Sequence, residues 1–322
     1  MNLVTTSSPH IRGNERTDRI MKDVLIALLP TIIAGVFFFG IRALLVILIS
    51  VISAMAGEAV WRLITKKEST VMDYSAAVTG LLLALTLPAS VPFWAAAAGS
   101  LFAVIVVKGM CGGLGQNTFN PALGGRAFLV AVCPVYVTRF LTAGTKLSVN
   151  VPVDAVSGST PLHDMVMNTM PEATLMDMFL GNIGGCIGEV SALALLIGGA
   201  YLVARKVITP RIPVAYIAAI AVLTMIFNKG NNPVEWMLYS ILGGGVMLGG
   251  IFMLTDYSSS PVTPLGQILY GIGAGALTVL FRYTGIFPEG VTYAILVMNA
   301  LAWVIDEKTK PRRFGLQKGG AK

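Results

Sequence analysis

The chain has 322 residues, of which 55% are hydrophobic and only 12% are charged, with a formal net charge of +7 and a mean hydropathy of +0.76. A soluble domain usually carries about 25% charged residues, so this composition excludes an ordinary soluble domain. The Lys and Arg residues stand at the ends of apolar stretches instead of covering one face, which argues against a partner nucleic acid. The composition predicts an integral membrane protein in contact with lipid.

Ten apolar stretches are candidate membrane spans, for which about 20 residues are usual. Their continuous apolar character favours an all-α fold, because the strands of a membrane β-barrel alternate. The expected spans cover 22–40, 41–63, 74–88, 92–110, 120–141, 184–205, 211–228, 236–254, 265–283 and 288–305. Proline or consecutive glycines interrupt several of them, which predicts some broken helices with backbone groups facing protein or a cavity.

The distribution of basic residues predicts the orientation. With both termini in the cytoplasm, seventeen of the 23 Lys and Arg residues lie on the cytoplasmic side and five on the outer side. The positive-inside rule favours this arrangement. It places the long polar loop at 142–183 on the outer side of the membrane, with five spans before it and five after it.

A weak internal repeat supports a division into two halves. Leu85-Thr86 and Leu254-Thr255 each precede a short polar run with proline and then a Gly/Ala-rich span that ends in a base. Five spans per half would invert the second half relative to the first, as in many transporters. The chain is thus expected to comprise an N-terminal tail at 1–21, a first repeat at 22–141, the outer loop at 142–183, a second repeat at 184–305 and a basic tail at 306–322.

The outer loop carries the most informative motif, the run DAVSGST at 154–160. Its general features are those of a solvated Gly/Ser/Thr turn. It nevertheless resembles the D-x-x-[S/T]-G-A-T motif at which a flavin transferase joins the phosphate of FMN to the last threonine. The resemblance makes Thr160 the expected FMN acceptor, flanked by Asp154, Ser157, Gly158 and Ser159, with Ser159 standing where the motif usually has alanine.

Further motifs extend the resemblance from about 21 to 306. They are GGLGQNTFNPA at 112–122, GGCIGE at 184–189, TDYSSSPVTP at 255–264 and FPEGVTYA at 287–294. With these motifs the chain resembles the NqrB/RnfD family, whose branches belong to the sodium-translocating NADH:quinone reductase and to the Rnf complex. The NqrB branch usually has a longer N-terminal extension, so the polar segment of about 21 residues favours the RnfD branch.

The resemblance implies a fold of about ten transmembrane helices in two inverted five-helix repeats, similar to urea transporters, within a multisubunit complex of the bacterial plasma membrane. It implies covalent FMN at Thr160, a second non-covalent flavin such as riboflavin, and electron transfer between ferredoxin and NAD coupled to Na⁺ or H⁺ translocation. The implied partners are Rnf subunits A, B, C, E and G, especially the FMN-bearing RnfG, and a flavin transferase. Such a subunit is not catalytic alone, and the sequence carries no iron–sulfur cysteine set of its own.

Ionisable residues within or beside the spans are candidates for the ion path, because a charge at membrane depth is costly and often functional. The candidates are Glu58, Asp73, Arg126, Glu189 and Asp256. Glu58 and Arg126 could instead snorkel or pair within the helix bundle, and Asp73 and Asp256 could lie at the membrane interface. Three cysteines without metal-ligand spacing give no reason to expect a metal site.

Two other functions fit parts of the sequence. The inverted repeat and the broken helices alone would suit a channel for a small polar solute. A purely structural anchor for redox subunits would keep the helices without using Thr160. The flavin motif distinguishes these alternatives, because neither a solute channel nor an anchor needs a flavin acceptor.

Overall fold

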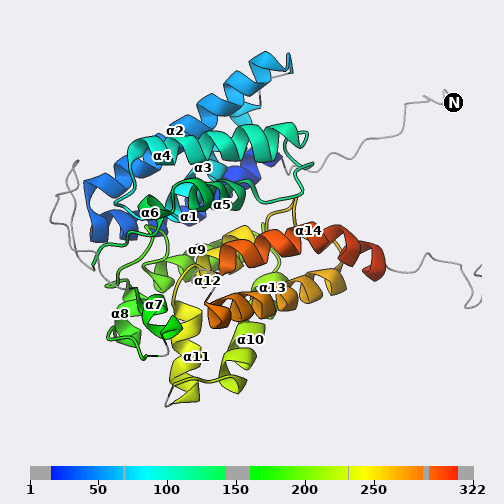
Figure 1. Ribbon diagram of the computed structural model, residues 1–322. Coiled ribbons are helices and arrows are strands. Elements are labelled where there is room, and N and C mark those ends of the chain that lie inside the picture. The colour runs from blue at the N-terminus through cyan, green and yellow to red at the C-terminus, as the bar shows by residue number, and fades with distance from the viewer. Residues whose placement is uncertain are drawn as a thin grey trace, which may run out of the picture.

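The computed structural model describes residues 16–67, 70–142, 160–167, 169–230, 232–285 and 290–310, which fold into helices without a β-strand (Figure 1). The first part holds α1 (Thr17–Phe39), α2 (Ile41–Ile64), the turn η1 (Val71–Asp73), α3 (Ser75–Leu85), α4 (Phe93–Phe102), its π-helical continuation η2 (Ala103–Met110), α5 (Pro121–Val132) and α6 (Pro134–Val137). The second part holds α7 (Pro161–Val166), α8 (Leu175–Leu180), α9 (Ala192–Ala204), α10 (Arg211–Ile226), α11 (Pro233–Leu242), α12 (Val246–Leu248), the π-helical turn η3 (Gly249–Met253), α13 (Pro264–Thr284) and α14 (Val291–Thr309).

Among the described helices, four are long and apolar enough to cross a membrane: α1, α2, the continuous α4–η2 helix and α13. The pair formed by α11 and α12–η3 is a fifth candidate, bent by 64° at its break. The shorter apolar helices are α3, α5, α9 and α10. These helices confirm that the chain is a membrane protein.

Every expected stretch contains a helix, but three helices are shorter than the sequence predicts. The helix expected at 120–141 ends at Val132, the one expected at 184–205 begins only at Ala192, and the one at 236–254 breaks at 243–245. In each case the missing turns contain glycine or precede proline, which favour irregular backbone over helix.

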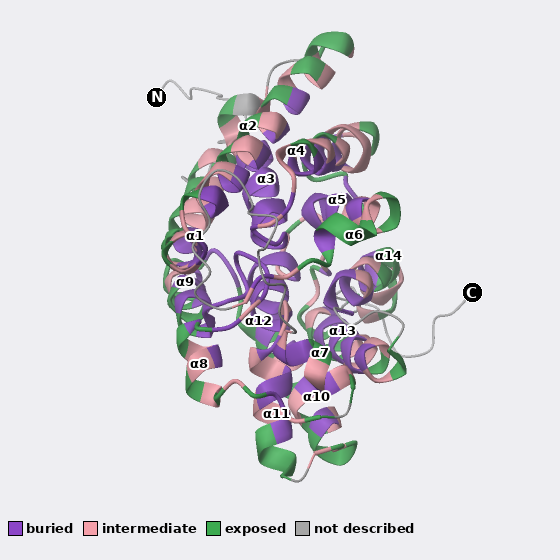
Figure 2. Cartoon of the chain, turned by 60° about the vertical axis from the view of Figure 1, so that its left-hand side comes forward, coloured by how far each residue is buried: buried purple, intermediate pink, exposed green. Residues whose placement is uncertain are grey.

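The helices form two groups that meet along the middle of the molecule. Helices α1 to α5 pack together, with α3 against α2 and α4, while α10, α11, α13 and α14 form the other group (Figure 1). Helix α9 of the second half packs against α1 of the first. All eleven residues of α3 are buried, so α3 lies at the centre of its group (Figure 2).

Small residues allow the closest helix contacts. A Cβ atom on Gly80 of α3 would lie 2.8 Å from the Ser50 carbonyl oxygen of α2, and one on Gly271 of α13 would lie 2.8 Å from the Ile212 carbonyl oxygen of α10. Helices associate in lipid mainly through such close packing, because burying apolar groups gains little there. Glycine at these positions therefore sets the distance between the paired helices.

Two irregular segments, 111–120 and 181–191, enter the fold between helices. In the second, the backbone N–H groups of Ile187 and Gly188 donate to the Leu87 and Leu85 carbonyl oxygens at the end of α3, at 3.0 and 2.8 Å. In the first, the Asn120 side-chain amide donates to the Met253 carbonyl oxygen at 3.1 Å. Backbone groups must be paired inside a membrane protein, and these bonds pair them across the two halves of the chain.

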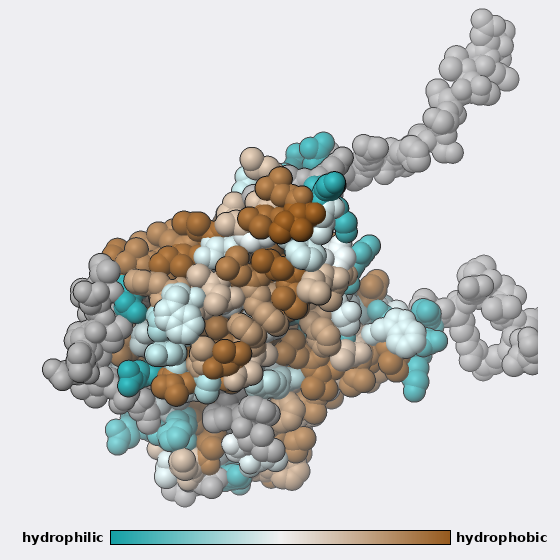
Figure 3. Space-filling view, turned by 45° about the horizontal axis from the view of Figure 1, so that its top comes forward, coloured by the Kyte–Doolittle hydropathy of each residue, from teal (hydrophilic) through white to brown (hydrophobic). Residues whose placement is uncertain are grey.

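The described surface is largely apolar. Side chains such as Ile33 and Phe37 of α1 are about two-thirds exposed. Figure 3 shows apolar side chains over much of the face in view, with hydrophilic groups gathered towards its margins. Exposed apolar area of this extent is typical of a surface covered by lipid or by other membrane subunits.

Candidate functional site

Thr160 lies within the expected outer loop at 142–183 and is the N-cap of α7, which begins at Pro161. Its hydroxyl oxygen accepts a hydrogen bond from the backbone N–H of His163 at 3.3 Å, as an N-cap does. The following Pro161 fits the first position of a helix because it has no N–H to satisfy. Thr160 remains partly exposed, while the flanking Asp154, Ser157, Gly158 and Ser159 lie outside the described residues.

A small cavity connects Thr160 to the interior. It is lined by Phe140, Thr160, Pro161, Leu162, Ile183, Gly184, Gly185, Glu189, Gly243 and Gly244. Glu189 also lines a second cavity, together with Thr86, Arg126 and Thr292 among others. The carboxylate of Glu189 therefore stands between a cavity that reaches Thr160 and one that reaches the end of α3.

Glu189 belongs to a buried group of charged and polar side chains that we call the Arg126 cluster: Arg126, Cys186, Glu189 and Arg282. A guanidinium nitrogen of Arg126 lies 3.7 Å from a carboxylate oxygen of Glu189, and both side chains are less than 10% exposed. Arg126 also donates to the Thr86 carbonyl oxygen and contacts the Cys186 sulfur at 3.7 Å. The structure thus brings together two of the predicted ion-path residues, Arg126 and Glu189.

The second arginine of the cluster comes from α13. Arg282 donates to the Ser240 and Gly243 carbonyl oxygens at 2.6 and 2.8 Å, at the end of α11. It is close enough to Glu189 for a charge–charge interaction. Gly245 leaves room for the carboxylate, since a Cβ atom there would lie 2.8 Å from the Glu189 oxygen.

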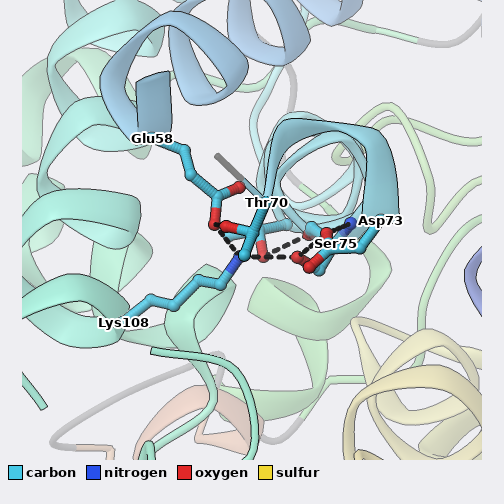
Figure 4. A network of polar contacts seen from close by, with 6 residues as sticks. Glu58, Thr70, Asp73, Ser75 and Lys108 are labelled. Atoms are coloured by element: carbon cyan, nitrogen blue, oxygen red, sulfur yellow. Dashed lines mark hydrogen bonds and ion pairs between the residues drawn. The ribbon is translucent and has the colours of Figure 1, made fainter. Parts of the chain in front are cut away.

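The Lys108 cluster lies elsewhere in the fold and comprises Glu58, Thr70, Asp73, Ser75 and Lys108 (Figure 4). The Lys108 ammonium contacts Glu58 Oε1 at 2.7 Å and Ser75 Oγ at 2.6 Å. Thr70 donates to the same Glu58 oxygen, and Asp73 accepts from Ser75 Oγ at 2.5 Å. Two further predicted residues, Glu58 and Asp73, therefore share one network. Glu58 Oε2 is buried there and has no hydrogen-bond partner among the described residues.

Asp256, the last predicted ion-path residue, lies in the turn before α13. Its carboxylate accepts hydrogen bonds from Ser258 and Ser259 at 2.9 and 3.0 Å. Burial raises the pKa of Asp256 above its usual range, and the nearby Lys108 acts in the opposite direction. Asp256 and Asn117 line both a cavity beside Lys108 and a neighbouring groove that reaches Asn299 and Trp303.

The sequence does not reveal that two central basic residues are buried. The orientation argument treats Lys108 and Arg282 as charges on the two sides of the membrane, but they are only 2% and 6% exposed. The signal that could have found them is the repeat itself, because each base ends a Gly/Ala-rich span that follows a short apolar helix. Among the described residues, no group of three or more His, Cys, Asp or Glu side chains is placed to hold a metal ion.

Comparison with known proteins gives the family. Residues 4–315 match the NQR2, RnfD, RnfE family. The chain belongs to this family. A family relative from Acetobacterium woodii, the D-type subunit of the Na(+)-translocating ferredoxin:NAD(+) oxidoreductase complex, is 46% identical over 99% of this chain and 97% of its own length.

Other family members are similar over comparable lengths. The D-type subunit of the proton-translocating ferredoxin:NAD(+) oxidoreductase complex of Clostridium ljungdahlii is 41% identical over 97% of this chain and 96% of its own. The D-type subunit of the ion-translocating oxidoreductase complex of Stutzerimonas stutzeri is 36% identical over 92% of each chain. The family resemblance inferred from the motifs is thereby confirmed.

Proposed function

We propose that this chain is the D-type subunit of an ion-translocating ferredoxin:NAD(+) oxidoreductase and that it carries FMN covalently on Thr160. The observation that carries the proposal is the similarity to oxidoreductase complex subunits along nearly the whole chain, at 46% identity for the Acetobacterium woodii protein. The protein would act within a complex, with Rnf subunits A, B, C, E and G as partners.

The surroundings of Thr160 suit the attachment of a phosphate-linked group. Its side chain is partly exposed, so a transferase can reach the hydroxyl, and small residues precede it in the sequence. The cavity beside it has Gly184, Gly243 and Gly244 in its wall, which leave the backbone accessible. When bound, the flavin would supply one- or two-electron transfer, while this chain would position it and set its electrostatic surroundings.

Support for the proposed inverted repeat comes from corresponding features of the two halves. The short helix α3 and the broken pair α11–α12 are the interrupted segments that an inverted-repeat transporter places near its site. Lys108 lies near the end of the long helix α4–η2 and contacts Ser75 at the start of α3. Arg282 lies near the end of α13 and donates to Gly243 at the end of α11. We therefore propose ten spans in two inverted halves, with both termini cytoplasmic and the Thr160 loop outside.

The two clusters provide groups for ion coupling. Glu58, Asp73 and Asp256 are acids near a single buried base, Lys108, which leaves an excess of negative charge that a cation could neutralise. We propose that this region belongs to the path of the translocated Na⁺ or H⁺. Glu189 and Arg126 are still predicted to belong to the same ion path.

A second, non-covalent flavin such as riboflavin is also part of the proposal. The groove that contains Asn117, Asp256 and Trp303 combines an aromatic ring with amide and carboxylate groups, a common composition for a ring-binding pocket. These residues fit a planar heterocycle with polar edges. They would bind and orient it near the Lys108 cluster.

The test of covalent attachment is flavin fluorescence in a denaturing gel, using the complex co-expressed with a flavin transferase. The wild-type chain and a Ser159→Ala variant should give a fluorescent band, and Thr160→Val should not. The Ser159→Ala variant is the matched control, because it removes the neighbouring hydroxyl. A dark wild-type band, with the transferase active on another substrate, would refute the flavin assignment and favour a solute channel.

A further inference from the structure

The Arg126 cluster has an unusual charge composition for a buried site. It contains two guanidinium groups, Arg126 and Arg282, and one carboxylate, Glu189. Arginine does not lose its proton in proteins. The carboxylate is therefore the group of the three whose charge can change.

Helix ends complete the balance of charge. Arg126 donates to the Thr86 carbonyl oxygen at the end of α3, and Arg282 donates to the Gly243 carbonyl oxygen at the end of α11. The C-terminal end of a helix acts as roughly half a negative charge. Two such ends and an ionised Glu189 together offset the two arginines, so the cluster is close to neutral before any ligand is added.

Glu189 shares a cavity with Thr160 and is the titratable side chain among the described residues that line it. Among the described residues that line the Thr160 cavity, the others are apolar residues, glycines and Thr160 itself. The groups that face Glu189 are Arg126 from α5, Arg282 from α13 and Cys186 from its own segment. Tyr293 of α14 and Tyr216 of α10 face the two arginines instead.

We propose that Glu189 takes up a proton when the flavin on Thr160 gains an electron. This inference rests on the proposed covalent flavin. One electron from a reduced iron–sulfur donor of the complex enters the flavin. One proton leaves a hydronium ion of the solvent, where an O–H bond breaks and water remains, and it forms an O–H bond on the Glu189 carboxylate. The negative charge that the electron adds near the cavity is thereby compensated, because the Glu189 carboxylate loses its negative charge.

The alternatives at this site do not provide the same balance. The Cys186 thiol already carries its proton and cannot take up another, and the arginines are fully protonated. A metal cation would have to enter between two guanidinium groups, which repel it at short range in a low-dielectric interior. Proton uptake by Glu189 adds one positive charge without introducing another ion.

The test is a redox titration of the assembled complex at several pH values, combined with redox-difference infrared spectroscopy. The same titration of the Thr160→Val complex, which would lack the covalent flavin, records the signals of the other redox centres. These signals are subtracted from those of the wild-type complex. For wild type, the midpoint potential for the first electron should fall as the pH rises, and reduction should produce a carboxylic-acid band. Glu189→Gln should remove both signals. Glu235→Gln, the same change at an exposed position of α11, should behave as wild type.

Other outcomes would overturn the inference. An unchanged pH dependence and infrared band in a Glu189→Gln complex that still shows fluorescent covalent flavin would exclude Glu189 as the proton acceptor. A potential that responds to sodium instead of pH would identify a metal cation as the compensating charge. A dark wild-type gel band, recorded before the titration, would instead refute the flavin assignment itself.

Discussion

The ammonium group of Lys108 lies 2.7 Å from a carboxylate oxygen of Glu58, and the two side chains are only 3% and 4% exposed. The pair joins η2 to α2, and Ser75 at the start of α3 accepts a further hydrogen bond from Lys108. Three helices are thus connected through one buried ammonium group. Breaking a buried pair leaves an uncompensated charge, which is far more costly than losing a surface pair.

Replacing Lys108 should therefore destabilise the fold strongly. We expect Lys108→Met to lower the free energy of unfolding by about 3–5 kcal/mol, measured by denaturation in detergent micelles. The double variant Glu58→Gln with Lys108→Met should recover part of that loss, because no unpaired charge remains. Arg205→Met is the control, since the Arg205 side chain is 59% exposed although its partner Asp23 is only 15% exposed. A pair with one exposed partner should cost below about 1 kcal/mol. Equal losses for Lys108→Met and Arg205→Met would contradict the prediction.

Close helix packing gives a second prediction. A Cβ atom on Gly198 of α9 would collide with the Ala27 carbonyl oxygen of α1, whereas one on Gly185 would meet none of the described residues within 4 Å. Gly198→Ala should thus separate α1 from α9 and cost about 1–3 kcal/mol, the usual range for overpacking. Gly185→Ala should leave thermal stability nearly unchanged. Comparable melting temperatures for the two variants would show that the helices can move apart without cost.

The capping box of α8 predicts a local pH dependence. Asp177 accepts hydrogen bonds from the Thr174 hydroxyl and backbone N–H at 2.6 and 3.2 Å, which lower the pKa of Asp177 below its usual value of 3.8. Because the folded pKa is depressed, the stabilisation is complete above 3.8 and disappears as the pH falls through the folded value. Hydrogen exchange of the Asp177 amide, corrected for intrinsic rates, should show this loss in wild type. The same profile in Asp177→Asn would refute it.

Asn120 offers a test of the contact between the two halves. Its side-chain oxygen caps α5 by accepting from the Ala122 and Leu123 amides, while its Nδ2 donates to the Met253 carbonyl oxygen. Asn120→Asp keeps the cap but replaces the donor by a buried carboxylate beside the Met253 carbonyl oxygen. It should cost at least about 1–3 kcal/mol, because the carbonyl loses its donor and a charge is buried. Asn232→Asp, at the exposed N-cap of α11, should be close to neutral. Equal unfolding free energies for the two variants would argue against the bond.

The sequence predicts the helices better than their interruptions. Apolar stretches locate α1, α2 and α13 within a few residues, since their length and composition suffice. The late start of α9 at Ala192 depends on Ile187 and Gly188 bonding to α3, a contact between segments about 100 residues apart. No local pattern contains that information.

The candidate site shows the same limit. The motifs name Thr160 and Glu189, but their common cavity arises only when α7 and the segment before α9 come together. Lys108 and Arg282 stand near span ends, where interfacial bases are common. Their burial becomes apparent only from the carbonyl and carboxylate groups that the fold places around them.

The hydrogen bonds that tie Ile187 and Gly188 to the end of α3, and Asn120 to Met253, have a mechanical consequence. Carriers that move a solute by rocking one half against the other need an interface that can slide. Here such sliding would expose backbone groups that find no water in the bilayer interior. The protein is therefore built as a fixed frame, whose two halves keep a constant separation.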